Sequence, residues 1–368
     1  MIFFNISAFF YFYFSIVGVY VIFMPKILQM IGYSPLQIGA IFAMAPLMRF
    51  LIPFIFLKYI ELSKKVFHLA LITLIFAAFS FFISIENFYF FALSNLFLGA
   101  SLGLILPYVE TYAMEYLKKE RFGKSRLYGS IGFMLIGIVL ARELKDDYLV
   151  GLYYFIVAVV ITTVFGFLVT YKNQDYTNTT NTSEKFTLSK ATYIWISLFF
   201  MQISFGAFYN FFTIYETNHG ISLEMTSYLW AFGVICEILF FYFQAPLLKF
   251  DLLKILQFSV LLVVIRWLLL FLFPSSIYIS FFSQSFHAIT FALHHTAAIS
   301  LLYNIYQNRK LAAQFYYGFS FGLGGFIGAI LAGYFYGPYL YLYASGMALL
   351  SFIALIKNDY CAKTKLLK

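Results

Sequence analysis

Charged residues are scarce in this sequence. Only 11% of its 368 residues are charged, and 63% are hydrophobic. Roughly a quarter of the residues of a soluble domain are charged, so the composition excludes a soluble globule and a disordered chain. A membrane-spanning helix needs about 20 apolar residues, and with roughly 30 residues per span and connection the chain holds about twelve spans. We therefore expect a polytopic membrane protein with no room for a folded soluble domain.

Cysteines and catalytic motifs are also scarce. Cys236 lies in an apolar run and Cys361 in the basic tail, so the two offer neither a disulfide framework nor a set of metal ligands. The motifs G-x-x-x-x-G-K-[ST], H-E-x-x-H and G-x-S-x-G do not occur. His294 and His295 are adjacent and point about 100° apart on a helix. We expect no ATP-driven motor, no enzyme activity, no catalytic residues, no metal site and no cofactor.

The chain is a series of apolar runs separated by short polar breaks. The runs are far longer than the roughly 9–11 residues of a barrel strand, so helices are expected. The first run has neither a basic segment before it nor a small-residue cleavage site, which favours a retained span over a signal peptide. The expected spans cover residues 4–28, 36–58, 66–84, 88–115, 127–141, 148–171, 191–215, 223–247, 253–272, 277–304, 311–334 and 339–357.

Lysine and arginine gather in alternate loops, beginning with residues 59–65. The opposite set of loops has little beyond Lys26, Arg142 and Lys145. Cytoplasmic loops collect lysine and arginine, so the net charge of +9 indicates orientation rather than a nucleic-acid partner. We expect a multi-pass protein of a bacterial inner membrane with both termini in the cytoplasm and the lipid bilayer around it.

The longest polar stretch, residues 172–190, is rich in threonine and asparagine. It reads as a flexible cytoplasmic linker between a segment of residues 1–171 and a segment of residues 191–368. These segments resemble each other: a shift of 188 residues places Gly18 on Gly206 and Arg49 on Glu237. Two parallel repeats with a site between them at the midplane are the major facilitator arrangement. The predicted fold is all-α and integral to the membrane, with twelve helices in two pseudo-symmetric six-helix bundles.

Ionisable residues inside the spans are the strongest site candidates, because each costs roughly 2.5–3.5 kcal/mol near the bilayer centre on insertion scales. Glu110 and Arg126 flank the short connection between two antiparallel spans, so they should lie close together. Arg49 and Glu237 hold equivalent positions and can pair with each other or with a solute. The full set is Arg49, Glu110, Arg126, Glu237, Arg266, His287, His294 and His295.

Structural roles remain open for the same residues. An ion pair of Arg49 and Glu237 would also serve only to hold helices together, and Arg126 would also serve as an anchor at a span end. His287, Thr290 and His294 follow an i, i+3, i+7 pattern and are expected to share one helix face. A histidine in a span more often makes hydrogen bonds between helices than carries protons, and we favour that role for His294.

The region from Glu110 to Phe133 resembles the lactose permease-like branch of the major facilitator superfamily, the oligosaccharide and nucleoside proton symporters. The resemblance implies that Glu110 and Arg126 bind solute and that Phe133 takes the place of a stacking tryptophan. It further matches Glu237, Arg266 and His287 to a glutamate, an arginine and a histidine of spans eight, nine and ten. In this branch a span-ten glutamate carries the proton, and here that position is Thr290.

The chain is more similar still to the phenylpropionate permease branch of this superfamily. This similarity rests on YFYFSIVGVYVIF at residues 11–23, Arg49-Phe50-Leu51, Gly233-Val234, Glu237-Ile238, Arg266-Trp267, His287, Thr290-Phe291 and His295. The resemblance implies proton-coupled symport of a small organic solute by alternating access. Because the span-ten glutamate carrier is absent, Glu237 is the first choice for proton coupling, since burial favours the neutral form of a carboxyl group. His287 is second, because an imidazole titrates near neutral pH, and His295 is the third residue of this set.

The charge balance bears on the solute. Arg49, Arg126 and Arg266 outnumber Glu110 and Glu237, which favours a carboxylate such as an aromatic acid over a sugar or a nucleoside, because arginine forks bind carboxylates. The alternatives are a proton-coupled efflux carrier, an uncoupled facilitator of the same fold, and a membrane scaffold that transports nothing. We expect the protein to be a monomer whose partners are the solute and protons.

Overall fold

The computed structural model describes residues 1–58, 62–144, 147–171, 187–244 and 246–366. Every regular element in these ranges is helical. Most of the linker predicted at residues 172–190 lies outside the described residues. We call residues 1–171 the N-terminal half and residues 187–366 the C-terminal half.

The first six predicted spans are all helical. The first is continuous, although a π-helix interrupts its α-helical hydrogen bonding. Three helices of this half begin at side-chain caps: Ser34 accepts a hydrogen bond from the backbone N–H of Gln37, Ser63 from that of Val66, and Asn87 from that of Phe90. The elements are α1 (Ile2–Gly18), η1 (Val19–Phe23), α2 (Met24–Ile31), α3 (Pro35–Lys58), α4 (Lys64–Ser84), α5 (Phe88–Glu143) and α6 (Leu149–Thr170).

The C-terminal half repeats this design with more interruptions. Ser222, Asp251 and Ser276 cap the helices that follow them through hydrogen bonds from backbone N–H groups. The elements are η2 (Leu188–Ala191), α7 (Thr192–Asn218), α8 (Leu223–Phe243), η3 (Leu247–Lys249), α9 (Leu252–Leu272), α10 (Ile277–Ser285), η4 (Ala288–Leu293), α11 (His294–Ile305), α12 (Arg309–Phe315), η5 (Tyr316–Gly324), α13 (Gly325–Tyr334) and α14 (Leu340–Leu366).

Among the described residues, 11 helical segments are long and apolar enough to cross a membrane. The span predicted at residues 277–304 is not among them, because the structure divides it into α10, the π-helix η4 and α11. With this divided segment the predicted set of spans is complete. The prediction of an all-helical integral membrane fold is confirmed.

The predicted fourth and fifth spans both lie within the 56-residue helix α5. In a straight helix Glu110 and Arg126, which are 16 residues apart, would be separated by about 24 Å. Their side chains are instead 3.1 Å apart. The chain therefore turns back within α5 while keeping helical hydrogen bonding, and the two stretches run antiparallel.

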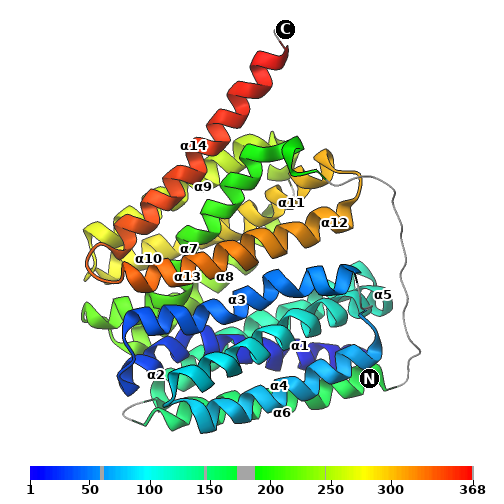
Figure 1. The fold of residues 1–368 in the computed structure, drawn as a ribbon, viewed down its shortest axis with the longest axis vertical. Coiled ribbons are helices and arrows are strands. Elements are labelled where there is room, and N and C mark those ends of the chain that lie inside the picture. The colour runs from blue at the N-terminus through cyan, green and yellow to red at the C-terminus, as the bar shows by residue number, and fades with distance from the viewer. Residues whose placement is uncertain (59–61, 145–146, 172–186, 245, 367–368) are drawn as a thin grey trace.

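The helices of each half pack mainly against their own half (Figure 1). In the N-terminal half α5 packs against α1 and α4, and α6 packs against the same two helices. In the C-terminal half α14 packs against α7 and α9, and α13 packs against α7. The halves meet where α3 packs against α13 and η5, and where α5 packs against α8.

Glycine residues bring α3 and α13 into direct backbone contact. A Cβ atom on Gly39 would lie 2.5 Å from the backbone oxygen of Ala329, and one on Gly333 would lie 2.6 Å from that of Pro35. These distances are shorter than any ordinary contact, so a larger residue would push the helices apart.

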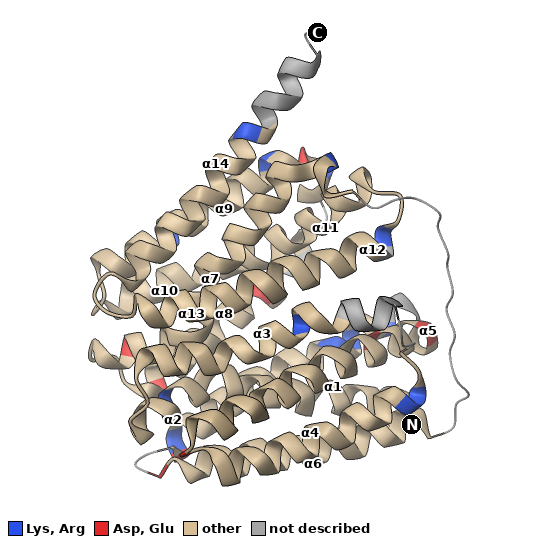
Figure 2. Cartoon of the chain, in the orientation of Figure 1, with Lys and Arg blue, Asp and Glu red and all other residues tan. Residues whose placement is uncertain are grey.

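The helices cross the molecule from one side to the other. We call the side that holds residue 2, the turn in α5 and the end of α6 the N-terminal side, which is on the right in Figure 1, and the other side the far side. Figure 2 shows long stretches of helix without charge, with charged residues mostly near the helix ends. The few charged residues deep in the bundle are therefore the candidates for a functional site.

Candidate functional site

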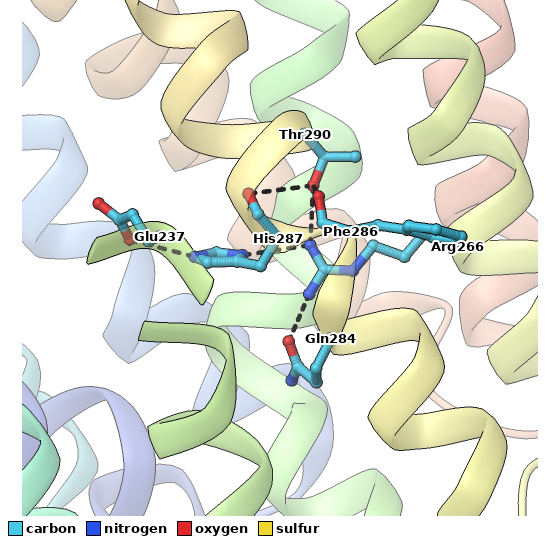
Figure 3. Close-up of polar contacts among 6 residues, drawn as sticks. All are labelled: Glu237, Arg266, Gln284, Phe286, His287 and Thr290. Carbon is cyan, nitrogen blue, oxygen red and sulfur yellow. Dashed lines mark hydrogen bonds and ion pairs between the residues drawn. The ribbon is translucent and has the colours of Figure 1, made fainter. Parts of the chain in front are cut away.

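Arg266 on α9 is fully buried, and span ten supplies its hydrogen-bond partners (Figure 3). Its Nη2 donates to Gln284 Oε1 at 2.7 Å, and its Nη1 donates to Thr290 Oγ1 at 3.1 Å. The same Nη1 lies 3.2 Å from His287 Nδ1. Three side chains of one divided span thus hold a single guanidinium, as the planar fork of arginine allows.

The geometry fixes how His287 is protonated. A guanidinium only donates hydrogen bonds, so the Nδ1 atom of His287 accepts from Arg266, and a neutral ring then carries its proton on Nε2. This Nε2 atom faces Glu237 Oε2 at 3.7 Å. Glu237, His287 and Arg266 therefore form one connected polar cluster across α8, span ten and α9.

The π-helix that interrupts span ten positions residues of this cluster. Thr290 lies in the π-helix η4, and its hydroxyl donates to the backbone oxygen of Phe286 at 2.8 Å while accepting from Arg266. On α8, Gly233 lies one turn before Glu237, and a Cβ atom there would be 3.2 Å from Gln284 Oε1. The small residue lets α8 approach span ten closely enough for Glu237 to reach His287.

Aromatic rings surround the buried arginine and extend into the N-terminal half. The guanidinium of Arg266 lies 4.6 Å from the ring centre of Phe208 and 4.7 Å from that of Trp267, within the range of cation–π attraction. Phe208 contacts Trp230 at 4.5 Å between ring centres. Trp230 contacts Phe133 of the N-terminal half at 6.2 Å, so Phe133 joins the aromatic wall of this cluster.

The N-terminal half contributes an ion pair. Arg126 Nε lies 3.1 Å from Glu110 Oε1, with about a third of each side chain exposed, 32% and 33%. The guanidinium of Arg126 also lies 4.0 Å from the ring centre of Phe14. The close approach expected from the sequence is therefore present, and the pair is accessible rather than sealed in the core.

Arg49 on α3 makes no hydrogen bond or ion pair with any described residue. It is exposed, and its charge acts on Tyr13, Tyr209 and Tyr317, which lie on α1, α7 and η5. Arg49 thus faces both halves. The direct pair with Glu237, one of the two possibilities raised by the sequence, is absent because Glu237 contacts His287.

The π-helix changes which histidine follows His287 along span ten. The ring of His287 stacks on Phe291 at 5.2 Å, and Phe291 stacks on His295 at 6.4 Å. A π-helix has backbone hydrogen bonds between residues i and i+5 and turns less per residue than an α-helix. His295 rather than His294 therefore completes the column of stacked rings that His287 and Phe291 begin. The expectation that His294 shares the face of His287 is wrong in this respect. His295 Nε2 lies 3.1 Å from the hydroxyl of Tyr317.

Charges of the two halves act on the same region. Arg126 lies within electrostatic range of Glu237. Tyr317 of the C-terminal half lies within range of Arg49, Glu110 and Arg126. In the described part of the chain no three His, Cys, Asp or Glu side chains are grouped to hold a metal ion.

The sequence did not single out Gln284, Phe208, Trp230 or Tyr317. Gln284 had a signal, since it lies three residues before His287 and so nearly shares a face with it. The aromatic residues had none, because rings that line a site and rings that face lipid look alike in a sequence with 23% aromatic residues.

An all-helical bundle with a polar cluster held among apolar spans is the architecture expected of a membrane transporter. A family model described as the MFS_1 like family matches residues 3–343, and the chain belongs to this family of the major facilitator superfamily. The predictions of a multi-pass membrane protein and of a transporter rather than an enzyme are confirmed.

Solved structures share the fold. The nucleoside transporter NupG has a TM-score of 0.75 at 14% identity, covering 97% of this chain and 98% of that one. The POT family transporter PepTSo has a TM-score of 0.74 at 9% identity, covering 100% and 98%. The human organic anion transporter MFSD10 has a TM-score of 0.63 at 13% identity, covering 96% and 98%. No curated protein matches the sequence.

Proposed function

We propose that this protein is a proton-coupled symporter that moves a small organic solute by alternating access between its two halves. The observation that carries the proposal is the connected cluster of Glu237, His287 and Arg266. A carboxyl group next to a neutral imidazole can take up and release a proton. The resulting change of charge at Glu237 acts on Arg266 through the hydrogen bond of Arg266 to His287. Glu237 is the proposed proton carrier, with His287 second and His295 at the end of the ring column.

The proposed solute carries a carboxylate, and an aromatic acid is favoured. Arg126 is paired with Glu110, and Arg266 is held by span ten. Arg49 has no such partner among the described residues, so its fork is available for a carboxylate. Phe133 with Trp230 supplies the aromatic surface.

The proposed working state faces the N-terminal side. The hydrogen bonds between described residues that cross between the halves all lie at the far side: Arg142 to Glu224 at 3.0 Å, Arg142 to Tyr228 at 2.9 Å, and Gln29 to Asn218 at 3.3 Å. The accessible pair of Glu110 and Arg126 lies toward the opposite side. With the N-terminal side placed in the cytoplasm of a bacterial cell, this state is inward-facing.

The proposed arrangement of two bundles follows from the packing of each half mainly against itself. Residues 1–171 and 191–368 would form two pseudo-symmetric bundles that rock against each other, joined by the linker at residues 172–190. The site lies between them, with Arg49, Glu110, Arg126, Phe133 and Arg266 as solute-binding residues. One chain holds all of these residues, so a monomer suffices.

Transport by purified protein in liposomes tests the proposal. Uptake of labelled 3-phenylpropionate should rise above equilibrium under an inward proton gradient, and Glu237→Gln should abolish accumulation but keep solute exchange. Glu115→Gln is the matched control, because Glu115 is exposed on α5 outside the cluster. Accumulation that survives in Glu237→Gln would remove Glu237 as the carrier. Uptake that ignores the gradient in the wild-type protein would refute coupling.

An uncoupled facilitator is the second candidate. Thr290 favours this candidate, because the lactose permease-like branch has its proton-carrying glutamate at this position. The hydroxyl of Thr290 accepts a hydrogen bond from Arg266 and donates one to the backbone oxygen of Phe286. A facilitator would equilibrate the solute at the same rate with and without the gradient. An efflux carrier would instead load vesicles only when the gradient is reversed.

A further inference from the structure

A second acidic residue is buried away from the cluster described above. Glu216 on α7 is 0% exposed and lies near the far side, two residues before the helix ends at Asn218. Its Oε2 accepts a hydrogen bond from Ser280 Oγ at 2.9 Å. Its Oε1 is buried and has no hydrogen-bond partner, and no basic side chain forms an ion pair with it among the described residues.

Tyrosine and histidine side chains surround Glu216. On its own helix are Tyr215 and His219, and His219 Nδ1 is bonded to the backbone oxygen of Tyr215 at 2.8 Å. From α14 comes Tyr341, which is buried, has no partner for its hydroxyl, and lies within electrostatic range of both Glu216 and Arg266. Tyr336 acts on Tyr215 and Tyr341 from the connection before α14. None of these residues is a lysine or an arginine, whose permanent positive charge would stabilise a buried carboxylate.

An ionised carboxylate without a positive partner is very costly in an apolar interior, whereas the protonated acid needs only hydrogen bonds. The site at Glu216 offers a hydroxyl donor from Ser280 for one oxygen and a buried, apolar setting for the other. A protonated acid leaves one O–H unpaired here, which costs far less than an unpaired charge, so the neutral acid is the favoured form.

Span ten connects this position to the central cluster. Ser280, Gln284 and His287 follow an i, i+4, i+7 pattern on one face of the span. Ser280 contacts Glu216, while Gln284 and His287 contact Arg266. A change of charge at Glu216 therefore acts on the same helix face that holds Arg266.

Glu216 also lies directly behind the closed far side. Its near neighbour Asn218 accepts a hydrogen bond from Gln29 Nε2 of the N-terminal half and donates to the hydroxyl of Tyr336 at 2.8 Å. On α2, Lys26 donates to Gln29 at 2.8 Å, so its charge is engaged there. Parting of the halves would break the contact of Gln29 with Asn218 and bring water to Glu216.

We propose that Glu216 with Ser280 is a second proton-binding site, which takes its proton when the far side opens and keeps it in the closed state. The proposal rests on the proposed proton coupling, and it adds a second protonatable carboxyl group to Glu237. A site for sodium ion is the competing occupant, since carboxylate and hydroxyl oxygens would serve it too.

Infrared difference spectra of the purified full-length protein in lipid, recorded over a pH series without solute, test the occupancy. The wild-type protein should show a carboxylic acid C=O band that is absent from Glu216→Gln and unchanged in Glu224→Gln, the control on an exposed carboxyl of α8. Ser280→Ala keeps the carboxyl group and removes its donor, so it should move the band to higher frequency. If Glu216→Gln does not fold, the band shift in Ser280→Ala still shows whether the band belongs to Glu216.

Several outcomes would overturn the proposal. These are a spectrum of Glu216→Gln that keeps every carboxylic acid band of the wild-type protein, a band of Glu216 that Ser280→Ala does not move, and a band of Glu216 that disappears on adding sodium chloride but not choline chloride. The last would assign the site to sodium. Because the spectra need no solute, their failure leaves coupling through Glu237 intact. Conversely, gradient-independent uptake in liposomes would refute coupling and leave the band of Glu216 in place.

Discussion

At the scale of the residue, the arginines of the candidate site differ in whether they have a partner within the protein. Arg126 and Arg266 already have partners within the protein, whereas Arg49 has none among the described residues. An engaged arginine contributes to stability and loses that contribution when it is replaced. An arginine without a partner contributes little to stability and is free to bind a solute.

Replacing Arg49 should separate binding from stability. A charge-assisted hydrogen bond is worth about 1.5–3 kcal/mol, so Arg49→Gln should weaken binding of 3-phenylpropionate about tenfold or more. The unfolding temperature without solute should stay near that of the wild-type protein. Solute-induced thermal shifts measure both quantities, with Arg121→Gln, an exposed arginine on α5, as the control. Equal affinity in the two variants would remove Arg49 from the site.

Local spacing explains which residues could be predicted. Glu110 and Arg126 were placed together correctly because a short connection joins their spans. Glu216 was overlooked because it stands beside Thr217, Asn218 and His219 at the end of an apolar run, where a carboxyl group normally meets water. Its burial comes from α10 and α14, which the sequence around it does not reveal.

At the scale of the element, the spans were predictable and their interruptions were not. The lengths of the apolar runs place most helix ends to within a few residues, as for the run at 148–171 and helix α6 (Leu149–Thr170). The run at 339–357 is an exception, because α14 (Leu340–Leu366) continues nine residues beyond it. The π-helices η1, η4 and η5 have no such signal, because a shifted backbone hydrogen bond leaves the composition unchanged. The same holds for the helical turn inside α5.

The contact of α3 with α13 should control the closed state. Gly39→Ala would place a Cβ atom 2.5 Å from the backbone oxygen of Ala329, and backbone cannot move aside as a side chain can. We expect this variant to shift the protein toward the state that is open at the far side. Distances between spin labels on the two halves measure the shift. Gly346→Ala is the control, since no atom lies within 4 Å of its added Cβ. An unchanged distance distribution in Gly39→Ala would contradict the prediction.

At the scale of the whole molecule, the far side is closed by few polar contacts. Arg142 and Glu224 form an ion pair whose side chains are 62% and 45% exposed. An ion pair exposed to this degree is worth about 0–1 kcal/mol. The closed state therefore depends mainly on helix packing, and it can open without breaking a strong bond.

A double-mutant cycle with Arg142→Gln and Glu224→Gln would measure this contribution. The coupling energy between the two side chains, read from the populations of the closed and open states, should not exceed about 1 kcal/mol and should fall in high salt. A coupling energy several times larger would show that the ion pair, not the packing of α3 on α13, holds the far side closed.

The halves approach each other most closely through main chain rather than side chains. At Gly39 and Gly333 the neighbouring atoms are all backbone atoms of the opposite helix. Interlocked side chains must exchange rotamers before two surfaces can separate, and ordering or releasing each one changes the conformational entropy. Two bare stretches of main chain have no rotamers to exchange. The halves can therefore part at this contact without any side chain changing its conformation there.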